Sequence, residues 1–326
     1  NGDNTITLGT EAQQAGILTV IGGTGNDIIN AATYTTAIYI EGGDGADTLT
    51  GGTGADTIDG GIGNDTITGG GGADSLMGGD GDNRFIFTDT VQFAAVTIAG
   101  GANTDTIQLT NDAQDLADAA FANKTSVEIL TTANGNNNIT LAANAQTAGI
   151  RTVNGGNGDD TINASTYGSS NHIYIDGGDG NDSITGGDGN DTLIGGNGVD
   201  TLTGGAGVNT FAFDGITTTA NRNIITDFTT GSGGDILRFD STTFQVTVSG
   251  TADINPSGAN NTADTIFYNT AGNIETYNQS NVRLGIATDT GDIFYDVDGN
   301  FAAGSVIIGN IGENNSGLLS QNILFV

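Results

Sequence analysis

The stretch GGDGADTLTGGTGADTIDGGIGNDTITGGGGADSL, residues 42–76, repeats a glycine-rich pattern every nine residues. Each repeat has the form G-G-x-G-x-D-x-U-x, in which U is a large aliphatic residue. Six of the nine positions suit a turn and three can be extended, so one side chain per short strand points inward. Two successive repeats then make one coil, and stacked coils form two parallel sheets with neighbouring strands about 4.8 Å apart. The pattern predicts a parallel β-roll filled by its U residues, Leu49, Ile58, Ile67 and Leu76.

The nonapeptide belongs to a longer internal repeat. It recurs in two blocks, each preceded by a single copy, and the four segments are 22–30, 42–86, 155–163 and 177–212. The segment NGDNTITLGTEAQQAGILTVIGG, residues 1–23, returns as NGNNNITLAANAQTAGIRTVNGG, residues 134–156. The two long copies differ by one whole nonapeptide, which indicates that the nonapeptide is a structural unit that can be gained or lost.

This organisation predicts an all-β protein, a parallel β-roll or β-helix solenoid with two nonapeptide blocks. Its regions are a first β-roll unit at 1–87, a connecting β segment at 88–133, a second β-roll unit at 134–213 and a β-rich C-terminal capping and secretion region at 214–326. One short helix is expected between the blocks, at NDAQDLADAAFANK. This helix would span 111–124 with Leu116, Ala120 and Phe121 on one face.

Composition excludes several functions. The chain has 38 acidic and 6 basic residues and a net charge of −32, so no basic surface exists to neutralise nucleic acid phosphates. There is no cysteine for disulfides or zinc thiolates, and no apolar run approaches transmembrane length. With a single histidine and neither an H-E-x-x-H nor a G-x-S-x-G motif, the sequence indicates that the protein is not an enzyme.

The recurring aspartates predict metal sites. Every second repeat lies on the same side of a roll, so Asp47 is expected over Asp65, and Asp56 over Asp74. Such stacked carboxylates repel each other, and one aliphatic side chain per nonapeptide makes only a thin core. Two carboxylates and several turn carbonyls supply about six oxygens, which suits Ca²⁺ better than Mg²⁺. We therefore expect a calcium ion between stacked turns.

The repeats resemble the calcium-binding β-rolls of the repeats-in-toxin (RTX) family, whose signature is this nonapeptide. The resemblance covers a little more than a third of the chain. It implies a parallel β-roll, calcium-driven folding outside the cell and type I secretion from a Gram-negative organism. Counting stacked pairs gives about seven calcium ions. Carried over by position, the ligands would be Asp27, Asp47, Asp56, Asp65, Asp74, Asp160, Asp182, Asp191 and Asp200.

Some turns depart from the pattern. Asn83 and Asn209 replace the aspartate in the last repeat of each block, which predicts weaker sites. A degenerate turn, GGANTDTIQ at 100–108, offers Asp105 as another weak ligand. There Asn103 replaces the glycine at the fourth position of the repeat, because asparagine is the next best residue at positive φ.

Two pairs of repeats are spaced more widely than the rest. The step from Asp27 to Asp47 and the step from Asp160 to Asp182 are both longer than two nonapeptides. The extra residues lie in ATYTTAIYI and ASTYGSSNHIYI, and they predict a longer loop in the intervening half-coil. The aspartates on either side would then still stack.

Other candidate ligands lie after the second block. ITDFTTGSGGDILRF, residues 225–239, resembles the segment that follows the roll in secreted RTX proteases. Asp227 and Asp235 would hold one more calcium by that resemblance, and a plain capping turn is about as good an interpretation. Asp296 and Asp298 form a short D-x-D-G loop, which suits a hairpin turn better than a lone calcium site.

The leading functional interpretation is a surface or structural protein: a calcium-stabilised segment of a surface layer, fibre or adhesin that associates with itself. It rests on the tandem units and on the lack of a catalytic set. The alternative is the secretion-and-folding domain of an exported enzyme or toxin, because the ending QNILFV resembles the apolar tails of type I secreted proteins. A carbohydrate-binding β-helix is a weaker third possibility, since the chain has no tryptophan for an aromatic groove. His172, the one histidine, is expected to be a surface residue.

Overall fold

The structure, a computed structural model, describes residues 2–213, 223–230 and 232–239 and later segments at 266–269, 284–287, 292–295, 306–311 and 323–325. The chain divides into two compact units, residues 1–154 and 155–326. Each unit consists mainly of short parallel strands, which confirms the all-β class and the parallel β-roll. The four region boundaries proposed from the sequence stay a prediction.

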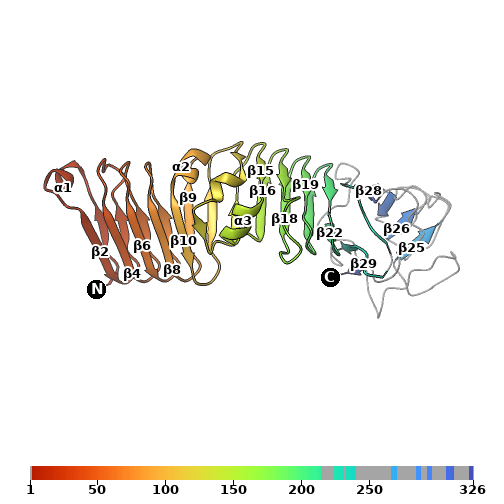
Figure 1. Cartoon of the computed structure of the whole chain (residues 1–326), viewed down its shortest axis with the longest axis horizontal. Coiled ribbons are helices and arrows are strands. Elements are labelled where there is room, and N and C mark those ends of the chain that lie inside the picture. Colours follow the sequence, from red (N-terminus) through yellow and green to blue (C-terminus); the bar gives the residue numbers. More distant parts are fainter. Residues whose placement is uncertain are drawn as a thin grey trace. The chain divides into compact units, whose positions relative to one another are not determined.

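Two parallel sheets build most of the first unit (Figure 1), and β12 and β15 pair apart from them. The first sheet contains, in spatial order, β1 (Thr5–Thr7), β3 (Ile28–Asn30), β5 (Thr48–Thr50), β7 (Thr66–Thr68), β9 (Arg84–Phe87), β11 (Thr106–Leu109), β14 (Ile129–Thr131) and β16 (Thr152–Asn157). The second contains β2 (Thr19–Thr24), β4 (Tyr39–Asp44), β6 (Thr57–Ile62), β8 (Ser75–Asp80), β10 (Thr97–Gly101) and β13 (Lys124–Thr125). Consecutive strands alternate between the two sheets as far as β11, so each coil contributes one strand to each sheet.

The interior of the first unit follows the predicted period. Leu49 lies beside Ile67 in the first sheet, and Ile58 lies beside Leu76 in the second, the members of each pair being two nonapeptides apart. All four side chains are at most 1% exposed. Because successive side chains of a strand point to opposite faces, the flanking threonines point away from the interior.

The helical segments of the first unit are short: α1 (Thr10–Gln14), α2 (Thr90–Ala95), the 3-10 helix η1 (Asp118–Phe121) and α3 (Ala143–Ala148). The predicted helix over 111–124 is wrong. That stretch forms β12 (Asp115–Leu116), which pairs with β15 (Asn138–Thr140), followed by η1 and the start of β13. Leu116 and Phe121 are buried as predicted. A strand and one 3-10 turn bring them inward equally well, because tertiary contacts override local helical periodicity.

The second unit repeats the roll. One set of parallel strands contains β18 (Tyr174–Asp179), β20 (Thr192–Asn197), β22 (Thr210–Phe213), β24 (Ile236–Phe239) and β29 (Ile323–Phe325). The other contains β17 (Thr161–Asn163), β19 (Ser183–Thr185), β21 (Thr201–Thr203), β23 (Asn223–Ile225) and β28 (Val306–Asn310). Beyond β28 follow β27 (Asp292–Tyr295) and β26 (Leu284–Ala287), both paired antiparallel, and then β25 (Ile266–Asn269). The described part of the C-terminal region is thus β-rich, as predicted.

Candidate calcium sites

Most glycine-rich turns bury one aspartate immediately before a strand. Asp47 precedes β5, Asp56 precedes β6 and Asp65 precedes β7, and each is 1% exposed. The turn before Asp47 needs glycine, because Gly43 and Gly45 have φ angles of 113° and 134°. Side chains other than glycine rarely adopt such angles. The repeated glycines therefore allow the turn, and the turn places the carboxylate inside the roll.

The turn residues of the first unit form two columns, one on each side of the roll. The first turn column contains Asp27, Asp47, Asp65, Asn83 and Asp105, and the second turn column contains Asp56 and Asp74. In both, the backbone N–H of one turn residue donates to the side-chain oxygen of the next coil's turn residue. The predicted stacking of Asp47 over Asp65, and of Asp56 over Asp74, is therefore observed.

One oxygen of each carboxylate is occupied by this contact. The Asp27 N–H donates to Asp47 Oδ1 at 2.7 Å, and the Asp47 N–H donates to Asp65 Oδ1 at 2.8 Å. The Asp56 N–H donates to Asp74 Oδ1 at 2.8 Å. The wider spacing between Asp27 and Asp47 is absorbed by a loop whose Tyr34 is fully buried. The column therefore stays in register across a coil of different length.

The second oxygen of most of these carboxylates is buried without a hydrogen-bond partner. In the first unit this holds for the Oδ2 atoms of Asp27, Asp47, Asp65, Asp74 and Asp105. Buried acceptors without a donor are rare in folded proteins, because each has lost its hydration. A bound ligand would therefore explain why a row of such oxygens is buried.

Backbone carbonyls face the same space as these oxygens. A Cβ added at Gly42 would collide with Asp47 Oδ2 and with the carbonyl oxygen of Gly60 in the next coil. At Gly60 the same collision involves Asp65 Oδ2 and the carbonyl of Gly78. Because glycine has no side chain, a space remains at this point. A carboxylate oxygen and a carbonyl oxygen face that space, and neither can donate a hydrogen bond to the other.

This donor set fits calcium. Ca²⁺ takes six to eight oxygen ligands from carboxylates and backbone carbonyls, and its flexible coordination tolerates small differences between turns. Among the described residues, no three His, Cys, Asp or Glu side chains converge on one point, so most ligands at each site would be carbonyls. Asp47 and Asp65 with the turn carbonyls would hold one ion, and Asp56 and Asp74 another. The bound ion would supply the positive charge that the buried carboxylates lack.

Burial shifts the titration of these groups. It raises the pKa of Asp65 to about 7, against the lowering effect of the Asp47 N–H, and the charges of Asp47 and Asp59 raise it further. Burial likewise raises the pKa of Asp74 to about 6 and that of Asp47 above its usual range. Without a cation, ionising these buried carboxylates therefore costs more than ionising an exposed aspartate.

The second unit has the same arrangement in two further columns. The third turn column contains Asp160, Asp182 and Asp200, and the fourth contains Asp191, Asn209 and Asp235. Burial raises the pKa of Asp182 to about 7 and that of Asp200 to about 6. The Oδ2 atoms of these two residues are also buried without a hydrogen-bond partner.

In two other aspartates, the second carboxylate oxygen accepts a hydrogen bond from a turn of the same coil. Asp56 Oδ2 accepts the Gly52 N–H at 2.7 Å, and Asp191 Oδ2 accepts the Gly187 N–H at 2.6 Å. Their second oxygens are therefore already paired, unlike that of Asp74. A calcium ion at these turns would have to share or displace that donor.

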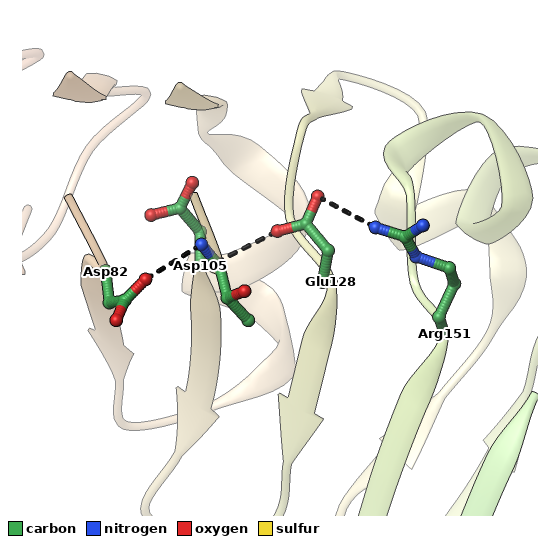
Figure 2. Close-up of polar contacts among 5 residues, drawn as sticks. Asp82, Asp105, Glu128 and Arg151 are labelled. Carbon is green, nitrogen blue, oxygen red and sulfur yellow. Dashed lines mark hydrogen bonds and ion pairs between the residues drawn. The ribbon is translucent and has the colours of Figure 1, made fainter. Parts of the chain in front are cut away.

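The first turn column continues beyond the repeats (Figure 2). Asn103 has a φ of 75°, which confirms that it takes the place of a glycine, and Asp105 is fully buried. The Asp105 N–H donates to Glu128 Oε2 at 2.9 Å, and Glu128 lies 3.8 Å from an Arg151 nitrogen. Glu128 therefore takes the position of a turn aspartate. Sequence reasoning missed it, because no glycine motif surrounds it.

An outer row of side chains supports the columns and was also missed. Asn26 Oδ1 accepts the Ala46 N–H at 2.9 Å, and Asn64 Oδ1 accepts the Asp82 N–H at 2.9 Å. Asp82 in turn accepts the Thr104 N–H at 3.0 Å (Figure 2). The signal was available in the sequence, since an asparagine or aspartate often stands directly before the turn aspartate.

The candidates after the second block behave differently from one another. Asp235 continues the fourth column through Asn209, and its Oδ2 accepts the Thr229 N–H at 2.7 Å. Asp227 accepts the N–H groups of Gly204 and Gly205, each at 2.8 Å, as a capping residue does. Nothing in these contacts brings Asp227 and Asp235 together.

Of the remaining candidates, only His172 lies among the described residues. His172 is exposed, as predicted, and its Nδ1 accepts the Asn190 N–H at 3.0 Å. Asp296 and Asp298 lie outside the described residues. No helix in the described part of the chain is long and apolar enough to cross a membrane.

Comparison with known families agrees with this geometry. The model of the RTX calcium-binding nonapeptide repeat, four copies long, matches residues 19–32, 39–67, 50–85, 152–166 and 176–211. No curated protein matches the chain. The matched segments contain all nine aspartates of the main predicted set, whereas Asp105 and Glu128 lie outside them.

Proposed function

The roll blocks of this chain belong to the RTX calcium-binding nonapeptide repeat family, and from this we propose that the protein is a calcium-dependent structural protein of the cell exterior. RTX repeats bind calcium, and proteins that carry them are typically exported by type I systems. Within that class we propose a segment of a surface layer, fibre or adhesin that folds after export from a Gram-negative cell and then assembles.

The observation that carries the proposal is the row of buried carboxylate oxygens without donors. A chain with a net charge of −32 cannot compensate these groups with its own six basic residues. Extracellular calcium modules bind at roughly 10⁻⁴–10⁻³ M, so such a chain would stay unfolded where calcium is scarce and fold where it is abundant. Calcium would thus couple folding to arrival outside the cell.

A non-enzymatic role is part of the proposal. The turn aspartates hold backbone N–H groups with one oxygen and face glycine carbonyls with the other, which suits metal binding better than proton transfer. The sequence has no cysteine, and its one histidine is exposed at a turn. These features support a scaffold built from repeated units.

Self-association is the second part. The tandem units and the parallel sheets of each roll suit end-to-end growth, because an unpaired strand edge can pair with another chain. Without metal, the net charge opposes contact between copies. About seven bound calcium ions would reduce it to roughly −18 and so favour association.

One observation favours the alternative, a secretion-and-folding domain of an exported enzyme or toxin. Strand β29, Ile323–Phe325 of the apolar segment QNILFV, pairs in parallel with β24 in a sheet of the second unit. Such a strand could complete the roll after export. In that case calcium would fold the chain without assembling it.

Circular dichroism and electron microscopy of the purified chain test both parts. We expect strong β signal and fibres or sheets in millimolar calcium, and neither in chelator. A chain that folds fully in chelator contradicts the calcium role. Folded but dispersed monomers at high protein concentration contradict assembly and favour the secretion domain.

A further inference from the structure

One segment of the first unit occurs twice, and the two copies have different surroundings. Residues 1–21 correspond to residues 134–154. Both form a short strand, a short helix and a second strand: β1, α1 and β2 in the first copy, and β15, α3 and the start of β16 in the second. The six apolar residues that are buried in the second copy all have an identical counterpart in the first, namely Ile6 and Ile139, Leu8 and Leu141, Ala12 and Ala145, Ala15 and Ala148, Ile17 and Ile150, and Val20 and Val153.

The second copy is covered by the preceding coil, residues 107–131, here called the linking coil. Leu116 of the linking coil lies beside Ile139, and Leu130 lies beside Val153, both in parallel strand pairs. The Val127 N–H donates to the Ala148 carbonyl at 3.0 Å. Strand pairing and apolar contact therefore seal this side of the second copy.

A carboxylate of the linking coil also holds the helix of the second copy. Asp118 accepts the N–H groups of Ala142 at 2.8 Å and Ala145 at 2.9 Å, and the side-chain amide of Asn144 at 2.9 Å. As a result, Ala145 is fully buried and Ile150 is only 1% exposed. The second copy thus shows which kind of coil covers this segment.

The first copy presents the same residues without that cover. Strands β1 and β2 each end their sheet in the described part of the chain, with β3 and β4 as their neighbours. Ile17 is 40% exposed where Ile150 is 1% exposed, and Ala15 is exposed where Ala148 is buried. Leu18 and Ile21 add further exposed apolar surface, at 57% and 56%.

We infer that this uncovered face of β1, α1 and β2 is an interaction surface for a coil built like the linking coil. The occupant would pair strands with β1 and β2 and bury Ile17, as the linking coil does for β15, β16 and Ile150. The inference deepens the proposed structural role, because it identifies how one repeated unit would join the next.

Where the copies differ, the differences specify the occupant. Leu18 stands where the second copy has Arg151, which pairs with Glu128 of the linking coil. Glu11 stands where the second copy has Asn144, which donates to Asp118. The occupant should therefore be apolar at the position of Glu128 and uncharged at the position of Asp118, because a carboxylate there would face Glu11.

An extended chain tests this inference. Residues 88–133 are repeated ahead of residue 1, and the added copy carries Glu128→Leu and Asp118→Asn. In the presence of calcium, hydrogen exchange in β1 and β2 should be about a hundredfold slower in the extended chain than in the original chain, since these edges become paired and buried. The existing β15 and β16 serve as the reference within the same molecule. An added copy that also carries Leu116→Asp is the matched control and should give no slowing.

Unchanged exchange in β1 and β2, with β15 protected, overturns the inference. An unsubstituted added copy that protects better than the substituted one overturns the stated specificity. Ile17→Asp provides a second measurement: it should leave the melting temperature of the original chain unchanged and abolish the protection in the extended chain. If Ile17→Asp lowers the melting temperature of the original and the extended chain equally, the inference is overturned. Calcium-dependent exchange at residues 42–83 is recorded in the same experiment, so failure of the proposed function is seen separately.

Discussion

Residues 42–83 and residues 84–131 are neighbouring parts of one roll, yet they compensate their buried polar groups by different means. In the first part, Asp47, Asp65 and Asp74 each bury an oxygen that has no hydrogen-bond partner. Glycine turns leave space beside these oxygens, and carbonyls of the next coil point into it. We therefore expect a bound cation to complete that part.

The second part is residues 84–131, here called the aromatic segment. Its buried groups are compensated largely by its own side chains. Phe93 packs edge-to-face on Phe87 and Phe121, with ring centroids 5.4 and 5.3 Å apart. Lys124 is 1% exposed, donates to the Val96 carbonyl at 2.7 Å and lies 4.6 Å from the Phe93 ring centre. The comparison teaches that the buried carboxylate oxygens without a hydrogen-bond partner are concentrated at the glycine turns, with Asp105 as the exception within the aromatic segment. We therefore predict that a need for calcium is local to these turns.

Removing calcium should give the largest effect and divide the two parts. We expect residues 42–83 to lose their slow hydrogen exchange in chelator, because their buried carboxylates then lack compensation. The aromatic segment should keep part of its protection. Exchange followed by mass spectrometry measures both, and millimolar Mg²⁺ is the control that should not substitute. Uniform loss across both parts would show that the roll responds as one cooperative body.

Phe93→Ala should produce the next largest effect, confined to the aromatic segment. Removing a fully buried aromatic ring costs about 3–5 kcal/mol of stability, and here it also exposes the Lys124 ammonium. Val91→Ala is the matched control, because Val91 is 77% exposed in the same helix and should change stability by less than about 0.5 kcal/mol. Chemical denaturation in saturating calcium gives both values. A similar loss in both variants would contradict the assigned core.

Asp65→Ala should weaken calcium binding more than Asp74→Ala does. Asp65 lies between Asp47 and Asn83 in the first turn column and can serve two stacked sites. Asp74 has only Asp56 as a partner in its column. We expect the calcium midpoint of folding to rise about tenfold for Asp65→Ala, equivalent to about 1.4 kcal/mol, and less for Asp74→Ala.

Asp44→Ala is the control for these two variants, since Asp44 is an exposed aspartate at the end of β4, in the repeat that contains Asp47. Its calcium midpoint should match that of the original chain. Titrations followed by circular dichroism supply all three midpoints. Equal shifts for Asp65 and Asp74 would contradict the column assignment, and a large shift for Asp44 would indicate a general charge effect.

Lys124→Met should give the smallest effect, a change in pH dependence. Burial lowers the pKa of Lys124 to about 8, whereas an unfolded lysine titrates near 10.4. Between these values the unfolded chain binds more protons, so stability should rise with pH from 8 to 10 by on the order of 1 kcal/mol. The rise should be absent in Lys124→Met at saturating calcium. A parallel pH profile in both proteins would show that Lys124 is not the group responsible.

Much of the roll and of its candidate sites could be predicted from the repeat. The period of nine gave the inward positions of Leu49 and Ile67 and the stacking of Asp47 over Asp65, because strand side chains alternate and glycine permits the turn. Even the wider spacing before Asp47 was interpreted correctly, since the loop around Tyr34 bulges without shifting the column. In these coils, local sequence and tertiary position agree.

The aromatic segment shows where local patterns mislead. The spacing of Leu116, Ala120 and Phe121 predicts a helix, but β12 and η1 bury the same residues. Strand pairing of β12 with β15 supplies backbone hydrogen bonds that an isolated helix would have to form alone. Glu128 escaped notice for a related reason, because its place in the first turn column depends on coils of 22 and 23 residues that no motif marks.

The sequence by itself determined the coil, the inward aliphatic residues and the spacing of the carboxylates, since these depend on contacts that recur with every second nonapeptide along the chain. Only the tertiary structure decided which residues outside the motif enter the columns, which oxygen of each carboxylate stays open, and that Lys124 faces inward. Those outcomes depend on how coils of unequal length stack, and stacking is set by the total fit of strands, loops and buried side chains rather than by any local pattern.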